Sequence, residues 1–129
     1  MAVEWQTSYR IGDAAVDAMQ EQLFALTNTF LASDDLTVLR SNVVSLCQHA
    51  RAQFEQEEAL MRRINFPGLE QHRAQHQMLL DRLIGRSMDV GKGYMNKPAI
   101  AALMQDWALR HVPEEDARLG HFLAASQSA

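Results

Sequence analysis

The 129-residue sequence has little of what disulfide-bonded, membrane-spanning or nucleic-acid-binding proteins require. It contains one cysteine, Cys47, which excludes an internal disulfide, and we interpret this residue as a small apolar side chain beside the core. Its 12 basic residues are outnumbered by 16 acidic ones and form no basic patch, which argues against a nucleic-acid partner. No apolar run reaches the roughly 18 residues of a membrane span, and the N-terminus lacks the apolar core of a signal peptide. We therefore expect a cytoplasmic protein that binds neither nucleic acid nor membranes.

Glycine and proline are also scarce, at six and three residues, and β-branched residues do not alternate with polar ones, so no segment is typical of a strand. Apolar residues instead recur at alternating steps of three and four, which predicts helices that each bury one stripe. The expected helices span about residues 14–32, 36–64, 69–90, 97 to near 113, and 114–123. Pro113 should kink or interrupt the last run. We expect residues 1–11 to be an extended arm packed on the body and residues 124–129 to be a frayed tail.

Residues typical of helix caps and turns stand at the ends of these expected helices. Asp13, Asp35 and Asn96 stand where a side chain can cap a helix N-terminus, and Asn65–Gly68 form a short turn between two helical runs. Long helices with short connections predict one domain over residues 1–129, an all-α, up-down-up-down four-helix bundle with an N-terminal arm.

Polar residues interrupt the apolar stripes at a similar depth in several helices. The stripes comprise Val16, Leu23, Leu26 and Phe30; Leu36, Leu39, Val43, Leu46, Ala50, Leu60 and Ile64; Leu69, Leu79, Leu83 and Val90; and Ile100, Leu103, Met104 and Trp107. The interrupting residues are Gln20, Gln53, Glu57, His72, His76 and His111, with Asp116 following after Pro113. A buried polar residue costs stability unless it is hydrogen-bonded or bound to something.

Two explanations of this polar set remain open. His72 and His76 are spaced about one helical turn apart, roughly 5.4 Å, so both imidazoles can bind one metal ion. Antiparallel helices joined by the 65–68 turn would bring Glu57 to the depth of His76. Three inward histidines with two carboxylates favour a metal site. The alternative is a polar plug whose histidines and carboxylates satisfy one another without metal.

At these residues the sequence resembles a hemerythrin-like domain of the bacterial single-domain kind, over nearly the whole chain. The resemblance rests on Trp5 and Tyr9, the segment Asp17–Leu23, Phe54–Glu58 with Met61, the Phe66–Pro67 turn, His72-x-x-x-His76, and Trp107-x-x-x-His111 with Asp116. It implies a four-helix bundle that holds two non-heme irons, bridged by a glutamate and an aspartate. One of these irons binds O2 reversibly in the family.

The resemblance also implies roles for five residues. Glu57 and Asp116 match the bridging carboxylates. His72, His76 and His111 match the three imidazoles of the first iron. The implied cofactor is iron, one ion and at most two, with zinc as an alternative metal.

The positions that match the second iron's two histidine ligands hold Gln20 and Gln53. An amide oxygen binds transition metals weakly compared with an imidazole, so the five remaining ligands suffice for one ion and not for two. The amide N–H groups can instead donate to carboxylate oxygens that no longer bridge. We therefore expect a degenerate second site, with O2 binding or transport weakened or lost.

Other polar residues are expected to lie outside the site. His49 and His121 can in principle replace a lost ligand, but we interpret both as ordinary helix-end or partly exposed residues. The charged residues Glu55, Glu58, Arg62 and Arg63 are interpreted as a solvated face.

The leading hypothesis is a metal-binding protein that senses or sequesters metal, or responds to O2 or another small diatomic molecule. One alternative is a mononuclear-iron enzyme that acts on O2, peroxide or superoxide. We rank it lower because the sequence offers no separate acid/base group. The other is a metal-free helical bundle used for protein contacts, with a partner that the sequence does not name.

Overall fold

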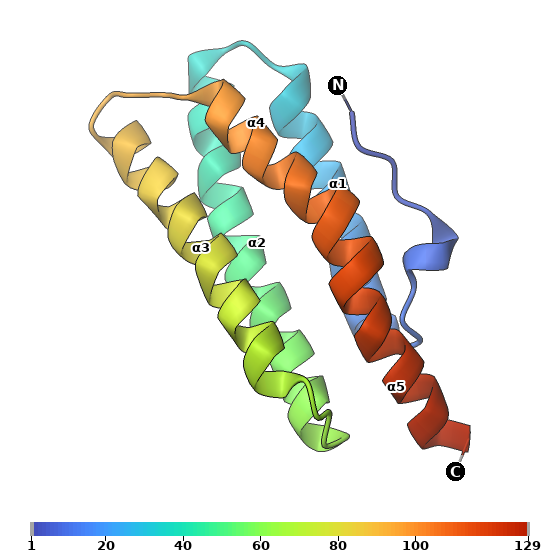
Figure 1. Ribbon diagram of the computed structural model, residues 1–129. Helices are drawn as coiled ribbons and strands as arrows, with labels where there is room; N and C mark the ends of the chain where they lie inside the picture. The colour runs from blue at the N-terminus through green and yellow to red at the C-terminus, as the bar shows by residue number, and fades with distance from the viewer. Residues whose placement is uncertain (1, 129) are drawn as a thin grey trace.

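The computed structural model describes residues 2–128 as a four-helix bundle (Figure 1). Met1 of the expected arm and Ala129 of the expected tail lie outside the described residues. The elements are the short 3-10 turn η1 (Thr7–Tyr9), α1 (Ala14–Ala32), α2 (Leu36–Arg63), α3 (Leu69–Gly91), and a fourth helix made of α4 (Lys97–Asp106), the π-helical segment η2 (Trp107–Asp116) and α5 (Ala117–Ser128). No strand occurs within residues 2–128.

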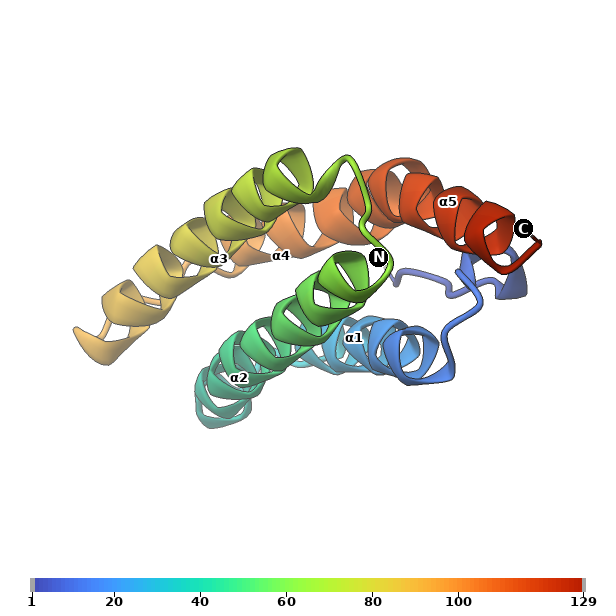
Figure 2. The same cartoon turned by 90° about the horizontal axis from the view of Figure 1, so that it is seen from below.

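The helices alternate in direction along the chain, which confirms the predicted up-down-up-down bundle (Figure 1). Seen from one end, α1 and α2 form one layer, and α3 with the α4–α5 helix forms the other (Figure 2). In the part of the chain that the structure describes, no helix is both long enough and apolar enough to cross a membrane.

Three helices begin at the capping residues that the sequence predicts. Asp13, Asp35 and Asn96 each accept hydrogen bonds from backbone N–H groups in the first helical turn, which would otherwise lack partners. The donors are Val16 for the first cap, Thr37 and Val38 for the second, and Ala99 for the third.

The turn between α2 and α3 occupies residues 64–68, and thus begins one residue before the predicted 65–68 turn. A Cβ at Gly68 would lie 2.8 Å from the Phe66 ring, so any larger residue at this position would require that ring to shift. Asn65 adopts a positive φ of 57°, which asparagine tolerates better than most residues. This tight reversal places the C-terminal half of α2 beside the N-terminal half of α3.

The buried apolar residues form two clusters along the bundle. The larger one includes Leu46, Phe54, Leu83 and Trp107, and the smaller one includes Leu60 and residues near both chain ends. Gln20, Glu57, His72, His76 and Asp116 lie along their helices between residues of one cluster and residues of the other, whereas Thr27 and His49 lie beside the larger cluster alone. The bundle therefore contains a polar layer between two apolar ones.

Several expectations about the stripes and the chain ends need correction. Leu36, predicted to face the core, is 44% exposed because it is the first residue of α2 and lies at the end of the bundle. Helix α5 continues to Ser128, so the backbone is helical where we expected fraying from residue 124 onward. Other stripe residues pack only at the margin of the clusters, namely Leu26, Ile64, Leu69, Val90 and Leu103.

The N-terminal arm packs on the bundle as predicted (Figure 1). Val3 and Ile11 are buried. Asn28 of α1 holds the arm from both sides: its Oδ1 accepts from the Val3 N–H at 2.7 Å, and its Nδ2 donates to the Val3 carbonyl at 2.8 Å. Asp17 Oδ1 accepts from the Ile11 N–H at 2.7 Å.

We predict that Asn28→Ala lowers the free energy of unfolding by about 1–2 kcal/mol, because it leaves the Val3 N–H and carbonyl without their partner. Urea denaturation followed by circular dichroism measures the loss. Thr29→Ala is the matched control, since Thr29 is exposed and its hydroxyl bonds only within α1. Equal losses in the two variants would contradict this role for Asn28.

Candidate metal centre

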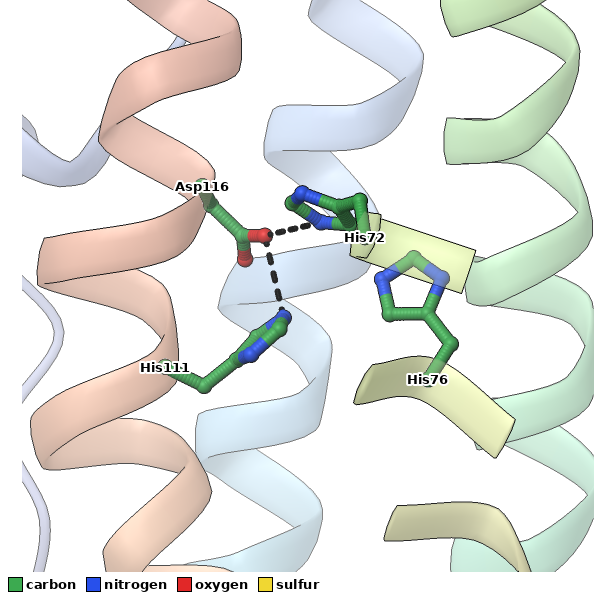
Figure 3. A group of neighbouring side chains, drawn as sticks. All are labelled: His72, His76, His111 and Asp116. Atoms are coloured by element: carbon green, nitrogen blue, oxygen red, sulfur yellow. Dashed lines mark ion pairs between the residues drawn. The ribbon is translucent and has the colours of Figure 1, made fainter. Parts of the chain in front are cut away.

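The polar layer brings together four of the five predicted ligands. His72, His76, His111 and Asp116 are all buried, and each offers one ligand atom within 4.8 Å of those of the others. His72 and His76 come from α3, and His111 and Asp116 come from η2. Figure 3 shows the imidazoles of His72 and His111 meeting the carboxylate of Asp116 across the space between these helices.

Glu57 lies beside this group of four. Its Oε1 is 3.5 Å from His72 Nε2 and 3.3 Å from His76 Nε2, and its side chain is fully buried. Asp116 Oδ1 is 3.0 Å from His72 Nε2 and 3.2 Å from His111 Nε2. His72 Nε2 thus lies against both carboxylates and connects Glu57 on α2 with Asp116 on η2.

None of these five atoms has a partner in hydrogen-bonding geometry, although ring nitrogens and carboxylate oxygens approach one another to 3.0–3.5 Å. The buried polar atoms without a partner include Oε1 of Glu57, Oδ1 of Asp116 and Nε2 of His72, His76 and His111. Buried polar groups in proteins are nearly always satisfied, so five unsatisfied atoms at one place require an explanation. Their separations of 3.0–3.5 Å suit donors around one cation. Neighbouring donors about 2.1 Å from a shared metal lie about 3.0 Å apart in an octahedron and about 3.4 Å apart in a tetrahedron.

The π-helical segment explains how His111 and Asp116 reach the same point. In an α-helix, residues five apart point about 140° away from each other around the axis. A π-helix forms hydrogen bonds between residues five apart, which brings such residues close to one face. Pro113 lies inside this segment. The α-helical repeat is interrupted around Pro113, as predicted, but by a wider π-helical segment through which the helix continues into α5.

His76 is held in one orientation by two contacts. Its Nδ1 lies 3.0 Å from Glu58 Oε2, and its ring stacks on Phe54 with centroids 3.9 Å apart. A carboxylate accepts, so His76 Nδ1 donates to it, and a neutral ring then turns a bare Nε2 toward Glu57. Our assignment of Glu58 to a solvated face is therefore wrong. Its side chain is only 18% exposed, and it supports His76.

In both Asp116 and Glu57, the second carboxylate oxygen accepts a hydrogen bond from a glutamine. Gln20 Nε2 donates to Asp116 Oδ2 at 2.9 Å, and Gln53 Nε2 donates to Glu57 Oε2 at 3.1 Å. Both glutamines are completely buried. These are the contacts that the sequence predicted for carboxylate oxygens that do not bridge.

The two remaining histidines, His49 and His121, differ in burial. His121 is exposed, as expected. His49 is not a partly exposed helix-end residue: it is only 9% exposed in the middle of α2, and its Nε2 lies 2.7 Å from the Met19 carbonyl and 3.1 Å from Gln53 Oε1. The sequence signal for this contact was that His49 precedes Gln53 by four residues, which places both side chains on one face of the helix.

The charges of the layer act on one another strongly. Burial by itself lowers the pKa of His72, but its contacts with Asp116 and Glu57 outweigh burial and raise the pKa from 6.5 to about 9. Burial by itself raises the pKa of Glu57, but the contacts with His72 and His76 outweigh it and hold the pKa far below its ordinary range. Without a metal ion, protons must therefore neutralise the layer.

Comparisons with known proteins agree with this arrangement. No protein-family model matches the chain. A bacteriohemerythrin from Ralstonia nicotianae is 26% identical over 124 residues, which cover 95% of this chain and 89% of the relative. A crystal structure of a mutant hemerythrin superposes with a TM-score of 0.83 at 20% sequence identity, covering 96% of this chain and 99% of the other.

The likeness in structure establishes a hemerythrin fold. The sequence similarity extends over nearly the whole chain, although it is distant. Taken together, the distant sequence similarity and the shared fold support membership of this chain in the hemerythrin and bacteriohemerythrin family.

Proposed function

We propose that this protein is a hemerythrin-like protein that binds a single metal ion, iron or alternatively zinc, through Glu57, His72, His76, His111 and Asp116. The observation that carries the proposal is the convergence of five buried donor atoms that have no hydrogen-bond partner. In the metal-free alternative, protons on the imidazoles would pair these nitrogens with the carboxylate oxygens 3.0–3.5 Å away, and the metal content of the purified protein distinguishes the two states.

The donor set also suits a divalent ion in charge and chemistry. Imidazole nitrogens and carboxylate oxygens are good ligands for iron and zinc. Three neutral imidazoles and two carboxylates carry two negative charges, which a divalent cation neutralises in a core where uncompensated charge is costly. When bound, iron would supply redox chemistry and an affinity for small diatomic ligands. The chain's own residues supply ligands, orientation and exclusion of water.

The glutamines favour one ion over two. Gln20 and Gln53 use their amide N–H groups on Asp116 Oδ2 and Glu57 Oε2, the oxygens that a second ion would need. An amide oxygen would be a weak substitute for an imidazole at such a second ion. We therefore propose that reversible O2 transport is weakened or lost, and that metal sensing or sequestration is the function.

We expect His72→Ala to weaken metal binding by more than about 100-fold, beyond the roughly 10- to 100-fold effect typical of supporting residues. Metal content per chain after dialysis, and competition with a chelator, measure the effect. His121→Ala is the matched control because His121 is exposed and lies outside the cluster. Unchanged affinity and stoichiometry in His72→Ala would show that the ligand assignment is wrong.

We expect the metal-free protein to lose stability as the pH rises from 6.5 to 9, because His72 has a raised pKa of about 9 in the folded state. The stabilisation is fully present below pH 6.5. It amounts to about 3 kcal/mol, since each pKa unit corresponds to about 1.4 kcal/mol. The lowered pKa of Glu57 acts in the opposite direction, so its contribution is lost as the pH falls below 4.5.

Urea denaturation at several pH values tests this prediction, with His72→Gln as the variant that should flatten the slope between pH 6.5 and 9. His121→Gln should keep the wild-type slope. Because a bound metal replaces the protons, the stabilisation by metal should increase over the same pH range. A wild-type slope in the His72→Gln protein would disprove the assignment.

We predict no more than one tightly bound metal per chain and no oxo-bridged di-iron spectrum in air. The double variant with Gln20→His and Gln53→His should raise the iron stoichiometry toward two and introduce reversible O2 binding, since histidine and glutamine have similar reach. Elemental analysis and absorption spectra under nitrogen and air provide the measurement. Two irons and O2 binding in the unaltered protein would overturn the single-ion proposal.

A further inference from the structure

His49, Gln53 and Glu57 lie four residues apart on one face of α2, and hydrogen bonds connect them in series. His49 Nε2 is 2.7 Å from the Met19 carbonyl oxygen on α1. A backbone carbonyl can only accept, so His49 Nε2 must carry the hydrogen. The same nitrogen is 3.1 Å from Gln53 Oε1, which also accepts. The backbone of α1 thus determines the tautomer of His49.

This tautomer in turn determines how the Gln53 amide is turned. With Oε1 toward the His49 N–H, Nε2 points at Glu57 Oε2, 3.1 Å away. The reversed amide would set an N–H against the His49 N–H and an oxygen against the carboxylate, and both contacts are repulsive. Gln53 is completely buried, so water cannot compensate for a wrong orientation.

The last member of the series is Glu57. Its Oε2 is occupied by the Gln53 N–H, which leaves Oε1 facing His72 and His76 at 3.5 and 3.3 Å. A carboxylate held through one oxygen in this way binds a metal through the other. Asp116 differs, because Gln20 donates to it while Gln20 Oε1 has no partner. The tautomer of a histidine therefore controls only the Glu57 side of the site.

We propose that His49 is a positioning residue for the metal site: it orients Gln53, and Gln53 holds Glu57 so that Oε1 is presented to the metal. The inference rests on the proposed metal-binding function. It adds a residue that does not contact the metal and is separated from it by two side chains. His49 thus acts on the metal only through Gln53, and this dependence can be measured.

A double-mutant cycle tests the dependence, with Co2+ as a visible substitute for iron(II) and a chelator competition to measure its dissociation constant. His49→Leu should weaken Co2+ binding by about 10-fold, in the range of supporting residues, and should shift the visible absorption band of the bound ion. In the Gln53→Leu background, the same His49→Leu change should have no further effect. His49→Gln keeps an N–H donor of similar reach and should recover most of the affinity.

Thr27→Val is the control for loss of stability alone, because Thr27 is completely buried and bonds only to the Leu23 carbonyl. It should leave the affinity and the spectrum unchanged. Equal affinities of the wild type and His49→Leu, or independent losses in the double variant, would overturn the role of His49.

Nuclear magnetic resonance of the metal-free protein separates this inference from the proposed function. The 15N shifts of His49 should show the hydrogen on Nε2, and a hydrogen on Nδ1 would overturn the series even in a protein that binds metal. Failure of the wild type to bind Co2+, iron or zinc would overturn the proposed function, and with it the role of His49 in metal positioning.

Discussion

The electrostatics of one buried layer underlie the rest of this structure. Each of three buried imidazole nitrogens lies 3.0–3.5 Å from at least one of two carboxylate oxygens, where solvent does not reach. Neutral imidazoles would set lone pair against lone pair, so the layer is stable only with positive charge inside it. Protons can provide that charge, as the raised pKa of His72 indicates, and a divalent ion can provide it at the same place.

The surrounding polar residues make this layer specific. Glu58 orients His76, Gln20 bonds Asp116, and Gln53 bonds Glu57, so the outward-facing polar atoms of these side chains are occupied while the inward-facing atoms stay free. The two apolar clusters on either side exclude water from the layer. The remaining carboxylate oxygens are used for hydrogen bonds with the glutamines, which is the basis for proposing a single ion.

Much of the fold was predictable, because a stripe with a period of 3.6 and a set of capping residues are both local properties. The four helices, the 65–68 turn and the packed arm follow from such patterns. Periodicity reports which face of a helix is buried but not how far along the bundle the burial extends, so Leu36 was misplaced. It also assumes an α-helical repeat, so the widened turns around Pro113 were missed.

By itself, the sequence determined the helices and the polar residues that interrupt their apolar faces, because both depend on spacing along one chain segment. The resemblance to hemerythrins added their expected roles as ligands, which remain a prediction. Only the tertiary structure decided that these atoms meet without hydrogen bonds, since this depends on distances between α2, α3 and η2. It alone also connected His49 to Glu57, because the tautomer of His49 is determined by a carbonyl on a different helix.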